Sequence, residues 1–229
     1  TSRIAHILRE NKAYPNQILS VTFTNKAARE MQNRVSKILN NKEVGLPWLG
    51  TFHSICAKIL RRHAKAVNLN QNFTIIDQED QVRLLKSICN AENIDIKKIS
   101  PNFIISLINK WKNLGWYPDD VILKKGENLE HNLLKIYKIY QTKLTNLNAC
   151  DFGDLIMHCV SIFEKNIDIN EMYSKNFKYI LVDEYQDTNF IQSKWLKLLT
   201  KTHDNICCVG DDDQSIHSWR GAEIKNFLE

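Results

Sequence analysis

Two adjacent carboxylates, Asp183 and Glu184, directly follow a short apolar run in the sequence. The run, residues 179–182, is bounded by polar residues, which is typical of a strand buried on both faces. In an open α/β sheet, ligands bind at the carboxyl end of such a strand. There the first carboxylate can hold Mg²⁺ on a nucleotide, and the second can orient and deprotonate an attacking water. The pair alone does not decide between this chemistry and a solvated acidic turn.

Three further segments resolve the ambiguity. Residues 21–28 read VTFTNKAA, residues 50–54 read GTFHS and residues 209–222 read VGDDDQSIHSWRGA. Together with VDEYQDTN at residues 182–189, and in this order, they closely resemble the superfamily 1 DNA helicases of the UvrD/PcrA/Rep group. The matches correspond to motifs Ia, Ib, II and III of that family, and the resemblance covers essentially all 229 residues.

The resemblance implies ATP and Mg²⁺ as cofactors and assigns roles in ATP hydrolysis. Asp183 is implied as the Mg²⁺ carboxylate and Glu184 as the general base. Gln214 matches the family glutamine that contacts the γ-phosphate of ATP and links hydrolysis to movement. Within motif II, we expect Asp187 and Thr188 to brace the turn by hydrogen bonds. The acidic run 211–213 is read as a loop at a strand end, in preference to a metal cluster.

The resemblance also implies a surface for single-stranded DNA. The implied contacts are Phe23, Thr22, Thr24, Asn25, His53, His217, Trp219 and Arg220. Phe23 and Trp219 are expected to stack on bases, a contact that tolerates any sequence, as a translocating motor requires. Core packing is the alternative for both rings. His217 departs from the family, which usually has tyrosine at this place, so a smaller stacking area is expected there.

A basic stripe supports the same kind of partner. Four cations share one face of the helix expected over residues 53–66, at positions i, i+3, i+4 and i+7: Lys58, Arg61, Arg62 and Lys65. A solvated face is one interpretation and a face that follows DNA phosphates is the other; with the neighbouring motifs we favour the second. The net charge of +5 also fits a polyanionic partner.

Alternating strand and helix patterns predict an α/β fold with a parallel sheet of the P-loop NTPase (RecA-like) type, interrupted by an all-helical insertion. Expected strands are residues 18–24, 48–51, 177–183 and 206–209. Expected helices are residues 3–10, 25–39, 53–66, 78–91, 100–113, 129–147, 151–164 and 189–200, with another near Glu223. We therefore predict a first part of the ATPase domain at 1–72, a helical insertion at 73–173 and a second part of the ATPase domain at 174–229.

The chain contains no Walker A loop, and it stops just after motif III. We therefore expect a motor truncated at both ends, whose further partners are the missing parts of the same motor. The six cysteines show no C-x-x-C spacing, so neither a structural metal nor a redox site is expected. No bilayer-spanning stretch or signal peptide is recognisable, which predicts a cytoplasmic protein without a membrane partner.

The leading hypothesis is part of an ATP-dependent 3′–5′ DNA helicase that translocates on single-stranded DNA and opens duplexes at junctions, in DNA repair. The alternative is a catalytically inactive fragment that at most binds single-stranded DNA weakly, and we prefer it for the isolated chain. A motor subunit of a helicase–nuclease is a third possibility.

Overall fold

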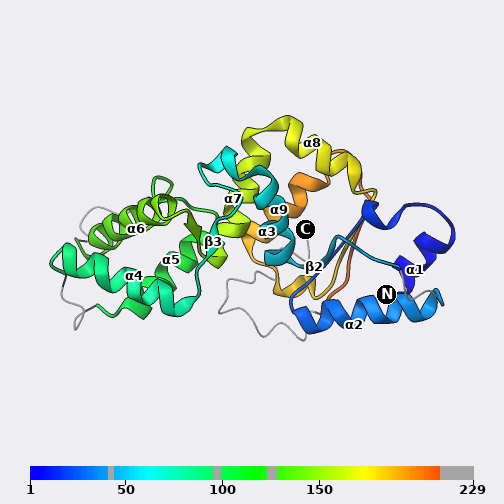
Figure 1. Cartoon of the computed structure of the whole chain (residues 1–229), viewed down its shortest axis with the longest axis horizontal. Helices are drawn as coiled ribbons and strands as arrows, with labels where there is room; N and C mark the ends of the chain where they lie inside the picture. Colours follow the sequence, from blue (N-terminus) through cyan, green and yellow to red (C-terminus); the bar gives the residue numbers. More distant parts are fainter. Residues whose placement is uncertain (41–43, 95–98, 123–127, 212–229) are drawn as a thin grey trace.

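The computed structural model describes residues 1–40, 44–94, 99–122 and 128–211. Figure 1 shows two regions side by side: a sheet with helices on both faces, and a bundle formed by α4, α5 and α6. No helix among the described residues is long and apolar enough to cross a membrane.

A four-stranded parallel sheet forms the centre of the first region. Its order is β2-β1-β5-β6, and its strands are β1 (Ile18–Thr22), β2 (Leu49–Thr51), β5 (Tyr179–Val182) and β6 (Ile206–Cys208). In the register, Val21 pairs with Val182, and Val182 pairs with Cys208. All strands are parallel, so their carboxyl ends meet at one edge of the sheet. The predicted α/β class with a parallel sheet is confirmed.

Helices cover both faces of this sheet (Figure 1). On one face lie α1 (Ser2–Arg9) and α2 (Asn25–Ile38), and on the other lie α3 (Phe52–His63), α7 (Phe152–Lys165), α8 (Ile167–Asn176) and α9 (Phe190–Leu199). Strand residues alternate between the two cores. Ile18 and Leu181 pack towards α1 and α2, whereas Leu19 and Ile180 join the larger core with α3, α7 and α9. Two-sided burial explains why the strands read as apolar runs.

The second region has a separate core. It is built from α4 (Gln78–Ala91), α5 (Pro101–Asn113) and α6 (Asn128–Asn146), with Leu85, Ile108 and Tyr137 among its buried side chains. A two-stranded parallel sheet of β3 (Thr74–Ile75) and β4 (Ala149–Cys150) lies where the chain enters and leaves these helices. α7 and α8 belong with the core under the larger sheet, because their side chains pack against α3 and α9. The domain limits at 73 and 173 stay a prediction.

A buried ion cluster connects the two regions. Lys112, near the end of α5, donates to Asp151 Oδ2 at 2.6 Å and to Asp154 Oδ1 at 2.7 Å. Asp151 and Asp154 also form the capping box that starts α7. The hydroxyl of Tyr140 adds a bond to Asp151 and the amide of Gln141 one to Asp154. Three elements from both regions therefore meet on two carboxylates.

Polar side chains cap several helices close to the positions where the sequence predicts a helix to start. Asp77 caps α4, Ser100 caps α5 with Pro101 as its first residue, and Asp151 caps α7. α2 begins at Asn25, the start expected from the sequence, and the residue before it is the cap. Thr24, and not Asn25, accepts the bond from Ala27 N, because the extended backbone of β1 continues through Thr24. α8, β3 and β4 were not among the elements expected from the sequence.

Candidate functional site

The two predicted catalytic carboxylates lie at the carboxyl edge of the sheet, immediately after β5. The backbone N–H of Asp183 donates to Val21 O at 3.0 Å, which extends the pairing with β1 by one residue. Glu184 then adopts a left-handed conformation (φ 53°, ψ 43°), which a non-glycine residue rarely occupies. The chain reverses at this point, and the short 3₁₀ helix Tyr185–Asp187 follows. Asp183 is half-buried and Glu184 is exposed.

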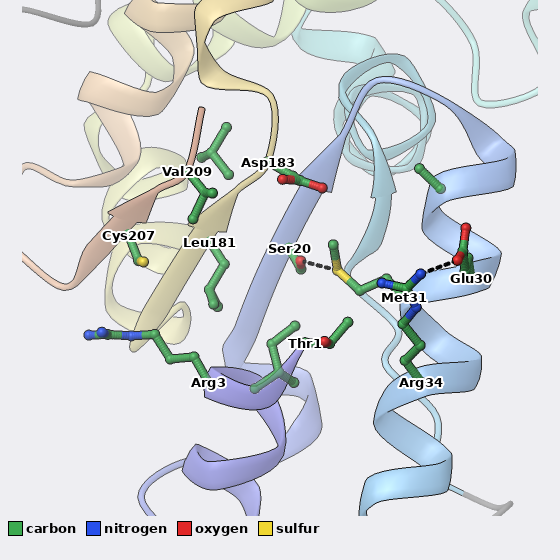
Figure 2. Close-up of a pocket in the computed structure, with 13 residues that line it drawn as sticks. Thr1, Arg3, Ser20, Glu30, Met31, Arg34, Leu181, Asp183, Cys207 and Val209 are labelled. Atoms are coloured by element: carbon green, nitrogen blue, oxygen red, sulfur yellow. Dashed lines mark hydrogen bonds and ion pairs between the residues drawn. The ribbon is translucent and has the colours of Figure 1, made fainter. Parts of the chain in front are cut away.

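Asp183 projects into a cavity on the face of the sheet covered by α1 and α2 (Figure 2). The cavity measures about 330 Å³ and is lined from β1, β5 and β6 as well as from both helices. Ser20, next to Asp183 in this view, donates to the sulfur of Met31 at 3.2 Å. Arg34 is paired with Glu30 on its wall. Asp183 is therefore the carboxylate with room for a ligand beside it.

The donor set of this turn fits Mg²⁺ carried by a nucleotide. Mg²⁺ is usually bound by one or two carboxylates and completed by water and phosphate oxygens, so it needs no protein cage. Asp183 and Glu184 supply those carboxylates at the place where α/β sheets bind ligands. Among the described residues, no group of three or more His, Cys, Asp or Glu forms a metal cage.

The rest of motif II holds the turn in place. Thr188 donates through its hydroxyl to Tyr185 O at 2.7 Å, which is the bracing role predicted for this residue. Gln186 was not assigned a role from the sequence. Its amide donates to Glu184 Oε2 at 2.6 Å and accepts from Asp211 N at 3.0 Å. Asn189 caps α9 and also donates to Asn113 Oδ1 at 3.0 Å, so the motif touches the end of α5.

Phe23 follows β1 at the same edge of the sheet but points to the opposite face from Asp183. Its ring lies 5.6 Å from that of Phe52, edge to face, and it is half-buried against the larger core. One part of the ring therefore packs inside, and another part stays accessible. The two interpretations of this side chain, core packing and base stacking, each describe one part of its surface.

The predicted role of Thr22 as a phosphate contact does not fit the structure. It is 1% exposed, because helices cover both faces of β1 and its side chain points inward from the strand. Thr24 and Asn25, two and three residues further along, are exposed at the start of α2. The Thr24 hydroxyl accepts the capping bond from Ala27 N, and it keeps its own proton to donate.

His53 lies near the start of α3, beside Phe152 of α7. The two rings are 5.8 Å apart and edge to face. Phe152 is 53% exposed, a large fraction for a phenyl ring. Phe152 is not among the DNA contacts that the family motifs imply. The signal available in the sequence was an aromatic residue directly after Asp151, which caps α7.

Comparison with known protein families gives a match over the whole chain. Residues 1–229 match the family described as "UvrD/REP helicase N-terminal domain". DNA helicase II of Rickettsia typhi is 46% identical over 232 residues, covering 100% of this chain and 35% of that protein. ATP-dependent DNA helicase PcrA of Staphylococcus aureus (strain Mu50) is 44% identical over 228 residues, covering 100% of this chain and 31% of that protein.

The chain belongs to the UvrD/REP helicase N-terminal domain family. It spans about a third of the length of these curated relatives. The suspected relationship to the UvrD/PcrA/Rep group is thereby confirmed. Motifs Ib, Ia and II lie on the neighbouring strands β2, β1 and β5 of the sheet, in that order.

Four of the residues that the UvrD-type motifs single out, Gln214, His217, Trp219 and Arg220, lie outside the described residues. Their roles in phosphate contact and base stacking stay predictions. The turn that precedes them is described up to Asp211, which Gln186 contacts.

The basic stripe on α3 is largely occupied by contacts within this UvrD-type domain. Lys58 donates to Pro47 O at 2.7 Å, and burial followed by the charge of Arg62 lowers its pKa. Arg61 donates to the carbonyls of Gln71 and Phe73. Arg62 lies 5.0 Å from the centre of the Trp48 ring. These contacts favour a structural role for three of the four cations, over the phosphate-following role expected from the sequence.

Proposed function

We propose that this chain is part of the motor region of an ATP-dependent 3′–5′ DNA helicase, and that the whole helicase hydrolyses ATP and translocates along single-stranded DNA. One observation carries the proposal. Asp183 and Phe23 leave adjacent strands at the same edge of the sheet and point to opposite faces, Asp183 into a cavity and Phe23 towards the aromatic side chains of α3 and α7. A nucleotide site and a base-stacking site would thus lie on opposite faces of the sheet, at the ends of two adjacent strands.

On the nucleotide face, Asp183 would hold the Mg²⁺ of bound ATP, and the ion would supply charge neutralisation at the phosphates. Glu184 is exposed on the turn and would accept a proton from the attacking water. Because a base acts only along a well-defined direction, its carboxylate must be oriented before the reaction. The bond from Gln186 to Glu184 Oε2 provides this orientation.

On the DNA face, we assign base stacking to the accessible part of Phe23 and to the His53–Phe152 ring pair. The exposed side chains of Thr24 and Asn25 would donate to backbone phosphates. Stacking on aromatic rings does not depend on base identity, which suits movement along mixed sequences. Strands next to duplex junctions in DNA under repair are the substrate class that we propose.

The cellular setting that we propose is the cytoplasm. All six cysteines are free thiols, and the Cys56 and Cys159 side chains are fully buried in the core. Free thiols that persist in the fold are typical of a reducing compartment.

The decisive experiment compares this chain with a longer helicase that carries it as its N-terminal domain. We expect DNA-stimulated ATP hydrolysis from the longer protein only, since this chain contains no Walker A loop to surround the β- and γ-phosphates. Hydrolysis by the isolated chain that Glu184→Gln abolishes would contradict the inactivity that we expect of it. A longer protein that binds single-stranded DNA without hydrolysing ATP would contradict the helicase proposal and favour a DNA-binding module.

A further inference from the structure

The side chain of Gln186 connects two segments that are far apart in the sequence. Its Nε2 donates to Glu184 Oε2 at 2.6 Å, and its Oε1 accepts from the backbone N–H of Asp211 at 3.0 Å. Gln186 is 2% exposed, so water competes little for either bond. The two bonds join the turn after β5 to the turn after β6.

The primary amide of Gln186 satisfies both neighbours. A carboxylate can only accept hydrogen bonds and a backbone N–H can only donate, so the group between Glu184 and Asp211 must donate on one side and accept on the other. An amide side chain does this at any pH. Neither a carboxylate, which lacks the donor, nor an ammonium group, which lacks the acceptor, can replace it.

Glu184 needs an external constraint. Its backbone is in the left-handed region, and its side chain is exposed, so packing does not restrict its rotamers. A charge-assisted bond of 2.6 Å from a buried donor is the kind of contact that selects one orientation.

We propose that Gln186 is the positioning residue for Glu184 and makes its orientation depend on the backbone at Asp211. This inference rests on the proposed role of Glu184 in ATP hydrolysis. Asp211 begins the acidic segment that leads to Gln214 in the sequence. A displacement of the backbone at Asp211 would move the Gln186 amide and, with it, the Glu184 carboxylate.

Two substitutions separate the two halves of the bridge. Gln186→Met keeps the length of the side chain and removes both bonds. Gln186→Glu keeps an oxygen that accepts from Asp211 N–H but removes the donor to Glu184 and places a second negative charge beside it. Gln192→Met is the matched control, because Gln192 is also buried and its amide only completes the cap of α9 with Asn189.

Kinetics are measured in the longer helicase that carries this chain. A base misplaced by about 1 Å loses roughly 100-fold in rate, so both Gln186 variants should lower kcat by about 10- to 100-fold while KM for ATP stays within about twofold. Gln192→Met should lower the thermal midpoint and leave kcat at the parental value. A merely structural role for Gln186 would give the opposite pattern, a lower midpoint with normal kcat, and would overturn the proposal.

Amide hydrogen exchange on the 229-residue chain tests the bridge without any activity. The Asp211 amide should lose protection in Gln186→Met and keep it in Gln186→Glu. Unchanged protection in the Met variant would mean that the bridge does not form. If Gln186→Met does not fold, kcat of Gln186→Glu decides the proposal.

The outcome also distinguishes this proposal from the proposed function. If Glu184→Gln hydrolyses ATP at the parental rate, the role of Glu184 fails and the inference fails with it. If hydrolysis depends on Glu184 but not on Gln186, only the positioning role is refuted.

Discussion

The ammonium group of Lys112 lies 2.6 Å from Asp151 Oδ2, and both side chains are excluded from solvent. A second carboxylate, Asp154, contacts the same ammonium group. Burial alone would lower the pKa of Lys112, but the charges of Asp151 and Asp154 raise it above its ordinary value. Burial and the charge of Asp154 raise the pKa of Asp151, whereas Lys112 and His158 outweigh burial and lower the pKa of Asp154.

Lys112→Met should be among the most destabilising single substitutions in this chain. It leaves two buried carboxylates without their cation, and removing one partner of a buried pair typically costs about 3–5 kcal/mol. Urea unfolding of the 229-residue chain measures the loss. Lys135→Met is the matched control, since the Lys135–Glu92 pair lies at the surface, where such pairs contribute about 0–1 kcal/mol. Equal losses in the two variants would show that the buried cluster has no special energetic role.

The unfolding free energy should fall as the pH is lowered through the ordinary range of histidine. His158 is in contact with the Tyr117 hydroxyl at 3.0 Å, and burial lowers its pKa below the ordinary value. The unfolded chain therefore takes up this proton at a higher pH than the folded chain. Below about pH 6.5 the unfolded state binds more protons, so stability is lost as the pH falls.

Urea unfolding at a series of pH values checks this prediction. His158→Gln should flatten the dependence. His63, whose pKa is also lowered by burial and by Arg62, adds to the same trend. A slope that survives in the His158→Gln, His63→Gln double variant would contradict this assignment.

Glu184→Gln, in a helicase that carries this chain, should abolish ATP hydrolysis and retain ATP binding. The substitution removes the base but keeps the size of the side chain. Loss of general base catalysis costs about 10²- to 10⁴-fold in rate. Single-turnover hydrolysis and equilibrium nucleotide binding separate the two effects. Loss of binding together with hydrolysis would assign Glu184 to holding the nucleotide instead.

Phe152→Ala should weaken single-stranded DNA binding by about 1–3 kcal/mol with little change in stability, because the ring is mostly exposed. Fluorescence anisotropy with labelled oligonucleotides and urea unfolding, both on the same variant, provide the test. Phe103 on α5 is about equally exposed, at 50%, and lies on a helix of the other region, so Phe103→Ala serves as the control. Equal binding by the two variants would remove Phe152 from the DNA surface.

Phe23→Ala should reduce both DNA affinity and stability. Part of the ring packs on Phe52, and truncating a buried Phe costs up to about 3–5 kcal/mol; the half-buried position predicts a smaller loss. Comparing binding at a temperature where both proteins are fully folded isolates the DNA term. A variant that loses stability but binds DNA like the parent would make Phe23 a packing residue only.

Features that depend on local chemistry and on motif spacing could be predicted from the sequence alone. Strands with two-sided apolar runs, and helices that begin at Asp77, Ser100 and Asp151, follow from burial period and capping, which act within a few residues. The location of Asp183 at the carboxyl end of a buried strand followed in the same way, from a run of four apolar residues before an acidic pair.

Contacts between side chains that are far apart in the sequence depend on the tertiary structure. Gln186 reaches Asp211, Lys112 reaches Asp151, and Asn113 reaches Asn189 only because parallel strands and packed helices bring distant segments together. Packing of these distant segments also explains why the cations of α3 contact carbonyls and rings of the chain itself. It likewise explains why Thr22 is buried, because helices cover both faces of its strand. Side-chain partners at that range are set by packing, which no local pattern encodes.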